Sequence, residues 1–242
     1  MPAVFLRAKS CRPSGICEVD AVDPHDLGVI LGAYLTGSIP FSQFIASWRT
    51  GLNLHEVGEG NIGSRNVWHV AGPAWGVLAA LLDCLKGYLV YKVASAIAPP
   101  AVALLAGIAV MLGHQFSIVL RGRGGKGLAT GLGVLLGLSP LSSLVGLIVL
   151  GLAFLLLRDF NPSVAVAIVA IILLPVLFRQ PLWISAYAMG LSLLAALKKR
   201  LDRPHETEVW RSHPWQGPAT PGWQAPAHQA GDESPSPDVR PH

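Results

Sequence analysis

Long apolar runs alternate with short polar segments along most of this chain. Apolar runs occupy residues 27–48, 73–98, 101–120, 141–157, 164–178 and 182–197, and a shorter run occupies 127–138. The long runs approach the roughly 20 residues that a helix needs to cross a bilayer. Backbone groups at membrane depth must pair within their own segment, so each run should be helical. The pattern therefore predicts an all-α integral membrane protein, a bundle of about seven transmembrane helices of which one is short.

Prolines mark the points where these helices should break. Pro40 lies inside the first run, where we expect a kink or a break. The uncharged stretch over residues 128–157 is too long for one span at about 1.5 Å per residue. Ser139 and Pro140 offer a break there, which would separate the short helix from a full span.

Composition supports a membrane location and argues against nucleic acid. The chain is 52% hydrophobic and 13% charged, whereas soluble domains carry about 25% charged residues. Its net charge of +4 comes from cations clustered at the ends of the runs, which is typical of membrane orientation and of loops that face phosphate. Three cysteines without paired spacing predict neither a disulfide framework nor a metal site.

The distribution of cations also predicts the orientation in the plasma membrane. With seven spans, one side receives the most basic segments, namely residues 49–72, 121–126, 158 and 198–200. The positive-inside rule places these glycine-rich loops and the C-terminus in the cytoplasm. Residues 1–26 have no apolar core and are not a signal peptide, so we expect a disordered arm. Residues 27–202 would form the transmembrane domain, and the Pro-rich segment 203–242 a disordered tail.

Two glycine-rich loops are expected on that cytoplasmic side. In the loop Gly122–Gly127, glycines let the backbone approach an anion, Arg123 and Lys126 add charge, and the following helix adds its positive end. This pattern predicts a phosphate cradle, with a flexible basic loop that sets the topology as the alternative. The loop Gly58–Asn66 could complete one site for two anionic groups, or it could be an ordinary connector.

A few ionisable residues fall within or beside the apolar runs. Asp83 and Lys86 are three residues apart, so they share a helix face that must point into the bundle. We favour a structural pair, with an ion path as the alternative. His114 could act as an acid or base or could be a packing residue. Arg158 and Ser163 could cap helix ends or hold phosphate.

Five segments in order resemble the bacterial acyl-phosphate:glycerol-3-phosphate acyltransferase family of the PlsY type. The likeness covers about residues 27–200 and is carried by Gly37–Phe41, Gly58–Asn66, Leu82–Gly87, Gly113–Phe116 and Gly124–Thr130. It implies a membrane enzyme that moves a fatty acyl group from acyl phosphate to the 1-hydroxyl of glycerol 3-phosphate. The products would be lysophosphatidic acid and phosphate, and no acyl-CoA, metal or cofactor is implied. The implied partners are these two substrates and membrane lipid.

The resemblance also suggests roles for individual residues. Lys126, His69 and Glu59 are the candidates for catalysis: Lys126 would neutralise charge, and Glu59 or His69 could take the proton of the acceptor unless the departing phosphate does so. The candidates for binding substrate are Asn61, Gly63, Arg65, Asn66, Lys86, His114, Gly124, Gly125, Gly127, Thr130, Arg158 and Ser163.

The chain departs from the family pattern at two places. The family loop reads approximately G-S-G-N-x-G-A-T-N-x-x-R, whereas here Glu59, Arg65 and His69 replace its Ser, Thr and Arg. A carboxylate would repel phosphate unless a cation neutralises it, and Arg65 would share a helix face with His69. The segment 194–201 also lacks the His and Asn of the family motif H-R-x-N-I-x-R-L, so the acceptor side is altered.

Three hypotheses follow in order of preference. The first is an acyltransferase of this family, with glycerol 3-phosphate or a related acceptor. The second is a degenerate homologue that binds lipid or a partner without turnover. The third is a transporter in which Asp83, Lys86 and His114 form an ion path. A neutralised Glu59 favours the first hypothesis, and an unneutralised Glu59 favours the second.

Overall fold

The computed structural model describes residues 23–212, which form nine α-helices and no strand. The all-helical fold expected from the sequence is therefore confirmed. Most of the expected N-terminal arm and residues 213–242 of the expected tail lie outside the described residues. The helices are α1 Pro24–Gly37, α2 Phe41–Thr50, α3 Ser64–Ala71, α4 Pro73–Ile97, α5 Pro100–Gln115, α6 Leu128–Leu138, α7 Pro140–Leu157, α8 Phe160–Leu177 and α9 Leu182–Ser212.

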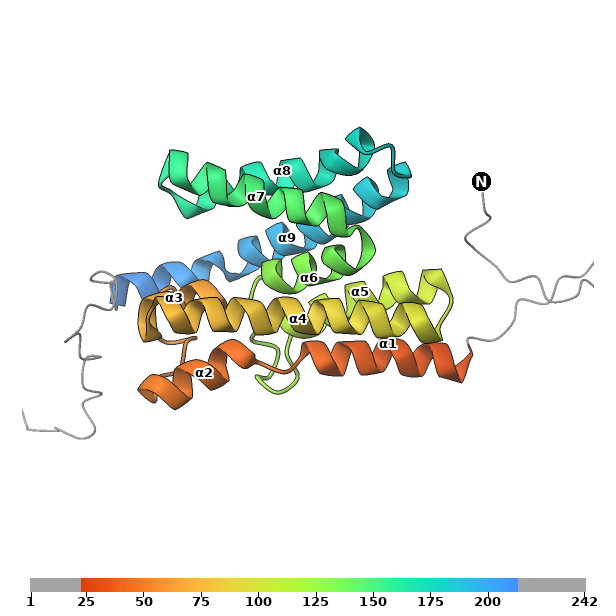
Figure 1. The fold of residues 1–242 in the computed structure, drawn as a ribbon. Coiled ribbons are helices and arrows are strands. Elements are labelled where there is room, and N and C mark those ends of the chain that lie inside the picture. The colour runs from red at the N-terminus through yellow and green to blue at the C-terminus, as the bar shows by residue number, and fades with distance from the viewer. Residues whose placement is uncertain (1–22, 213–242) are drawn as a thin grey trace, which may run out of the picture.

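The long helices run back and forth along one common direction (Figure 1). Helices α7 and α8 form an outer layer at the top of the view, α6 and α9 lie in the middle, and α4, α5 and α1 lie below. The short helices α2 and α3 gather with the end of α9 at the left of the view. The start of α1 lies at the opposite end, so the polar segments around α2, α3 and α9 share one end of the bundle.

Several segments have the length and composition of membrane spans. Within residues 23–212, three helical segments are both long and apolar enough to cross a bilayer: residues 24–50, 140–157 and 160–177. Helices α5 and α6 are apolar but shorter. Leucines on α7 and α8 point outward, as Leu156 and Leu177 illustrate with exposed fractions of 83% and 74%, which suits contact with lipid. The expected count of about seven spans stays a prediction.

The breaks expected at two prolines are present. The first run divides at residues 38–40, because α1 ends at Gly37 and α2 begins only after Pro40. The uncharged stretch divides at Ser139, and Pro140 occupies the first turn of α7, where its missing N–H is tolerated. The short helix expected before this break is α6.

Three expected boundaries were wrong. Helix α5 ends at Gln115 instead of 120, since Ser117 turns to donate a hydrogen bond to the Ser38 carbonyl (2.5 Å). Helix α8 begins before 164, because the Asp159 side chain caps it by accepting from the Asn161 amide (3.0 Å). Helix α9 continues through the expected boundary at 203 to Ser212, so residues 203–212 are helical and not a disordered tail.

Glycines allow two pairs of helices to pack with their backbones in contact. A Cβ at Gly37 or Gly113 would collide with the backbone of α5 or α1, respectively. A Cβ at Gly87 would strike the Thr130 carbonyl of α6, and one at Gly133 would strike α4. Small residues at such crossings are typical of membrane helices, where close packing drives association. These two contacts fix α5 and α6, and hence the glycine-rich loop between them.

Candidate active site

Glu59, Arg65 and His69 form one charged cluster. The Glu59 carboxylate lies 2.8 Å from Arg65 Nε and 3.1 Å from His69 Nε2. Arg65 and His69 are one turn apart on α3, as the spacing predicted. Burial alone would raise the pKa of Glu59, but the hydrogen bond with His69 and the charge of Arg65 outweigh it and lower this pKa. The carboxylate is thus ionised at neutral pH and neutralised by its neighbours.

Asn66 organises the first glycine-rich loop. Its Nδ2 donates to the carbonyls of Leu54 (2.9 Å), Val57 (3.0 Å) and Asn61 (3.0 Å). Its Oδ1 accepts from the Glu59 amide (3.0 Å). Both ends of the buried amide are therefore engaged with the protein, and the expected direct contact with phosphate is wrong for this residue. Asn66 instead fixes the conformation of the loop, because both its amide oxygen and its amide nitrogen are hydrogen-bonded to the backbone.

Lys126 meets a residue that the sequence did not single out. Its Nζ lies 2.8 Å from a carboxylate oxygen of Glu206, on the extended part of α9. Lys126 also helps to lower the pKa of Glu59, so its charge lies near the first loop. The same turns of α9 place the buried Val209 against Gly60. The end of α9 is therefore a wall of the site, formed by residues expected to be disordered.

Gly124 and Gly125 serve close packing more than anion binding. A Cβ at either position would collide with His114 at the end of α5, and at Gly125 also with the Ile62 carbonyl. The Gly125 amide donates to the His114 carbonyl (3.2 Å), so this N–H does not face a ligand. Gly127 adopts a left-handed conformation (φ 80°) where α6 begins, which favours glycine. The two glycine-rich loops do meet, as expected, through Ile62 and Gly125.

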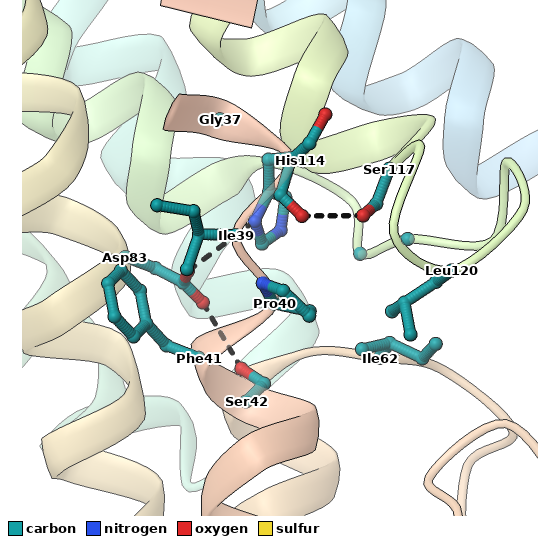
Figure 2. Close-up of a pocket in the computed structure, with 13 residues that line it drawn as sticks. Gly37, Ile39, Pro40, Phe41, Ser42, Ile62, Asp83, His114, Ser117 and Leu120 are labelled. Carbon is teal, nitrogen blue, oxygen red and sulfur yellow. Dashed lines mark hydrogen bonds and ion pairs between the residues drawn. The ribbon is translucent and has the colours of Figure 1, made fainter. Parts of the chain in front are cut away.

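A buried ionic network lies beneath these loops (Figure 2). Asp83 contacts Lys86 Nζ (2.7 Å), the Ser42 hydroxyl (3.1 Å) and His114 Nδ1 (3.5 Å). Lys86 Nζ also lies 3.0 Å from the Ile39 carbonyl and 3.0 Å from His114 Nδ1. The network joins α4 to α5 and to the break between α1 and α2. It is the structural pair that the sequence analysis favoured.

The cavity beside this network is too small for a substrate. It holds about 10 Å³ between residues such as Pro40, Ile62 and His114, which is room for about one water molecule. Lys86 and His114 are 4% and 9% exposed. The network holds Lys86 Nζ and His114 Nδ1, whereas the His114 ring also lines the cavity, so the expected role of both residues in binding substrate stays a prediction.

The remaining candidates divide between buried and exposed positions. Thr130 is fully buried at the contact with α4. Ser163 is buried and donates to the Asp159 carbonyl one turn earlier (2.6 Å), so its hydroxyl is engaged within α8, and its expected role in holding phosphate stays a prediction. Arg158 is exposed in a left-handed conformation at the end of α7. Asn61 is buried, and Gly63 lies directly before α3.

A polar contact links the first loop to α8. Arg65 Nη1 donates to Asn161 Oδ1 (3.0 Å), and its guanidinium lies 5.2 Å from the centre of the Phe160 ring. Neither Asn161 nor Glu206 was predicted, because both lie far from the glycine-rich loops in sequence. The Glu59–Arg65–His69 cluster and the polar residues around it therefore come from α3, from the loops before α3 and α6, from the start of α8 and from the end of α9.

Fold and site together define a helical membrane protein with a cluster of charged residues at one end of its bundle. A sequence model of the family "Glycerol-3-phosphate acyltransferase" matches residues 27–204. The chain belongs to this family, as the resemblance implied.

Individual relatives agree with this assignment. The glycerol-3-phosphate acyltransferase of Geotalea daltonii is 34% identical over 176 residues, which is 72% of this chain and 90% of the relative. The Myxococcus xanthus enzyme of the same name is 44% identical over 123 residues, 50% of this chain and 64% of that relative. A crystal structure of PlsY, an integral membrane glycerol 3-phosphate acyltransferase in its glycerol 3-phosphate form, superposes with a TM-score of 0.68 and 31% identity, covering 76% of this chain and 92% of PlsY.

Proposed function

We propose that this chain is a membrane acyltransferase that moves a fatty acyl group from acyl phosphate to glycerol 3-phosphate. The products are lysophosphatidic acid, a phospholipid precursor, and inorganic phosphate. The observation that carries the proposal is the neutralised Glu59: Arg65 and His69 both contact its carboxylate, and Lys126 lies near. The substituted loop thus supplies a cationic partner for the one negative charge that Glu59 introduces, as a working phosphate site requires.

The reaction needs positioning and charge stabilisation more than strong nucleophilic activation. The acceptor hydroxyl oxygen attacks the acyl carbonyl carbon, the bond from that carbon to the phosphate oxygen breaks, and phosphate leaves with the electron pair. Lys126 stabilises the developing negative charge, and Arg65 neutralises Glu59 so that the loop can accept the donor phosphate. The hydroxyl proton passes to the departing phosphate, with the His69–Glu59 pair as the alternative acceptor.

The site faces the cytoplasm in this proposal. The basic segments around residues 121–126 and 198–200 follow the positive-inside rule. The end of α9 and the short helices α2 and α3 share one end of the bundle (Figure 1). The C-terminus would accordingly be cytoplasmic, where glycerol 3-phosphate is available, and the protein would reside in the plasma membrane.

The identity of the donor is tested with labelled glycerol 3-phosphate and the protein in lipid vesicles. Palmitoyl phosphate is expected to give labelled lysophosphatidic acid, whereas palmitoyl-CoA gives none above protein-free vesicles. Mass spectrometry identifies the product. Equal product from palmitoyl-CoA would contradict the assigned donor, and no product from either donor would favour the homologue without turnover.

Arg65 should matter chiefly because of Glu59. We expect Arg65→Ala to raise the KM for palmitoyl phosphate about tenfold, since Glu59 would lose the arginine at 2.8 Å and repel the phosphate more strongly, an effect on the order of 1 kcal/mol. The double variant Arg65→Ala/Glu59→Ser should recover much of this loss, because the repelling charge is gone. Both KM values are measured by phosphate release. A double variant as impaired as Arg65→Ala would mean that Arg65 acts independently of Glu59.

A further inference from the structure

The last turns of α9 lie against the charged cluster. Residues 205–212, which we call the C-terminal cover, continue α9 beyond residues 27–204 that match the family. They lie beside α3 at one end of the bundle (Figure 1). Glu206 of the cover reaches Lys126, with 2.8 Å between a carboxylate oxygen and Lys126 Nζ. A segment outside the matched part of the chain thus contacts the proposed catalytic lysine.

Arg65, His69 and Lys126 each contact a carboxylate when the cover is in place. Arg65 and His69 lie 2.8 and 3.1 Å from Glu59, and Lys126 contacts Glu206. Only 18% of the Lys126 side chain and 19% of the Glu206 side chain are exposed, so solvent screens this pair weakly. A phosphate group at Lys126 Nζ would lie close to the Glu206 carboxylate and be repelled by it. Phosphate and Glu206 therefore compete for Lys126.

Lys126 is held by its backbone, so the cover is the partner that can move. The Lys126 carbonyl accepts a hydrogen bond from Nε2 of the buried Gln115 (3.0 Å). The cover, in contrast, begins directly after Pro204, which lies inside α9. Proline has no N–H to donate to the carbonyl of Arg200 one turn earlier, and helices bend at such positions. Pro204 is therefore a hinge between the preceding part of α9 and the cover.

Two further contacts hold the cover on the segment before α3. The His205 ring stacks on His55 with centroids 3.8 Å apart, and His205 Nε2 lies 2.8 Å from the His55 carbonyl. Val209 is buried, and a Cβ at Gly60 would come within 3.0 Å of it. Burial and the charges of His205 and Arg123 lower the pKa of His55, so the stack does not join two positive rings at neutral pH. These contacts are local and can open without unpacking the spans.

We propose that the C-terminal cover is an autoinhibitory device in which Glu206 occupies the position of a substrate phosphate on Lys126. The inference rests on the proposed function, because it takes Lys126 to be the residue that meets phosphate. Phosphate displaces Glu206, and the cover swings away about Pro204. The closed cover weakens the apparent affinity for substrate, because only open molecules can bind. Linkage is reciprocal, so phosphate must favour the open cover by the same factor.

Variants of the cover test this competition by steady-state kinetics in vesicles. Glu206→Gln removes the competing charge and should lower the KM for palmitoyl phosphate or glycerol 3-phosphate about fivefold, with kcat within about twofold of the wild type. Val209→Ala keeps the charge but loosens the packing on Gly60, and should lower the same KM. Glu208→Gln removes an exposed carboxylate of the cover and should match the wild type. Thermal unfolding checks that each variant is folded.

Two kinetic results would overturn the proposal. One is a wild-type KM for both substrates in Glu206→Gln and in Val209→Ala, which would mean that the cover does not compete with substrate. The other is a raised KM or a kcat lowered tenfold or more in Glu206→Gln, which would make Glu206 a residue that positions Lys126 for the reaction.

Hydrogen–deuterium exchange follows the cover without any acyl transfer. Exchange of residues 205–212 is compared in inorganic phosphate, in glycerol 3-phosphate and in chloride of equal ionic strength. At least one of the two phosphate compounds should speed this exchange several-fold, and Glu206→Gln should exchange faster than the wild type in chloride. Exchange that neither compound changes would overturn the proposal. A wild type whose cover opens with phosphate but that makes no lysophosphatidic acid would contradict only the proposed reaction.

Discussion

Replacing Lys126 with alanine should lower acceptor-dependent phosphate release by about two to three orders of magnitude. Lys126 lies at the meeting point of the two glycine-rich loops and the end of α9, and its charge reaches Glu59. Gly125 has its amide engaged by the His114 carbonyl, so backbone donors cannot replace the lost charge. The initial rate is measured in vesicles with palmitoyl phosphate and glycerol 3-phosphate.

Two further variants make this result specific. Lys199→Ala removes an exposed cation of α9 and should retain the wild-type rate. Lys126→Arg keeps the pairing with Glu206 and should be less impaired than Lys126→Ala, provided that thermal unfolding shows all variants folded. A rate for Lys126→Ala within threefold of the wild type would remove Lys126 from the mechanism.

Replacing Asp83 with alanine should destabilise the protein by about 3–5 kcal/mol, because breaking a buried ion pair leaves an unpaired charge. Lys86 would lose its carboxylate partner (2.7 Å), and the uncharged Ile39 carbonyl and Phe41 ring would remain beside it together with His114. The network also joins α4 to the α1–α2 break and to α5, so its loss should loosen the frame beneath both loops. The change is measured by equilibrium denaturation in detergent micelles.

The double variant Asp83→Leu/Lys86→Met should recover much of that stability, since apolar replacement of a whole buried pair is often neutral or better. Activity in this double variant then reports how far the network positions the loops. An Asp83→Ala protein as stable as the wild type would show that Lys86 finds another partner or releases its proton. In that case the network would not hold the helices together.

Much of the fold follows from local pattern. Apolar runs and the prolines at 40 and 140 predicted where helices would form and divide. The end of α9 was not predicted, because residues 203–212 are polar and contain Pro204. Their helical order depends on contacts with distant residues, including Val209 against Gly60 and His205 against His55. Such contacts leave no periodic signal in a single sequence.

The candidate site was likewise predicted only in part from the sequence. The Glu59–Arg65–His69 cluster was foreseen because Arg65 and His69 are one turn apart on α3. Asn66 was assigned to substrate, but burial directs its amide to protein partners, and Lys86 Nζ and His114 Nδ1 are held in the buried network. The same side chains can bind a ligand or satisfy buried backbone groups, and only the structure separates these uses. Glu206 was missed because its partner Lys126 lies 80 residues earlier in the chain.

The central claim is that a charge-compensated loop still supports acyl transfer. Phosphate release from palmitoyl phosphate by purified protein in lipid vesicles, with and without glycerol 3-phosphate, tests it most directly. The account predicts release that depends on glycerol 3-phosphate and rises with protein concentration. Release no greater than in protein-free vesicles, from a folded sample at saturating glycerol 3-phosphate, would contradict the account and leave a homologue that binds without turnover.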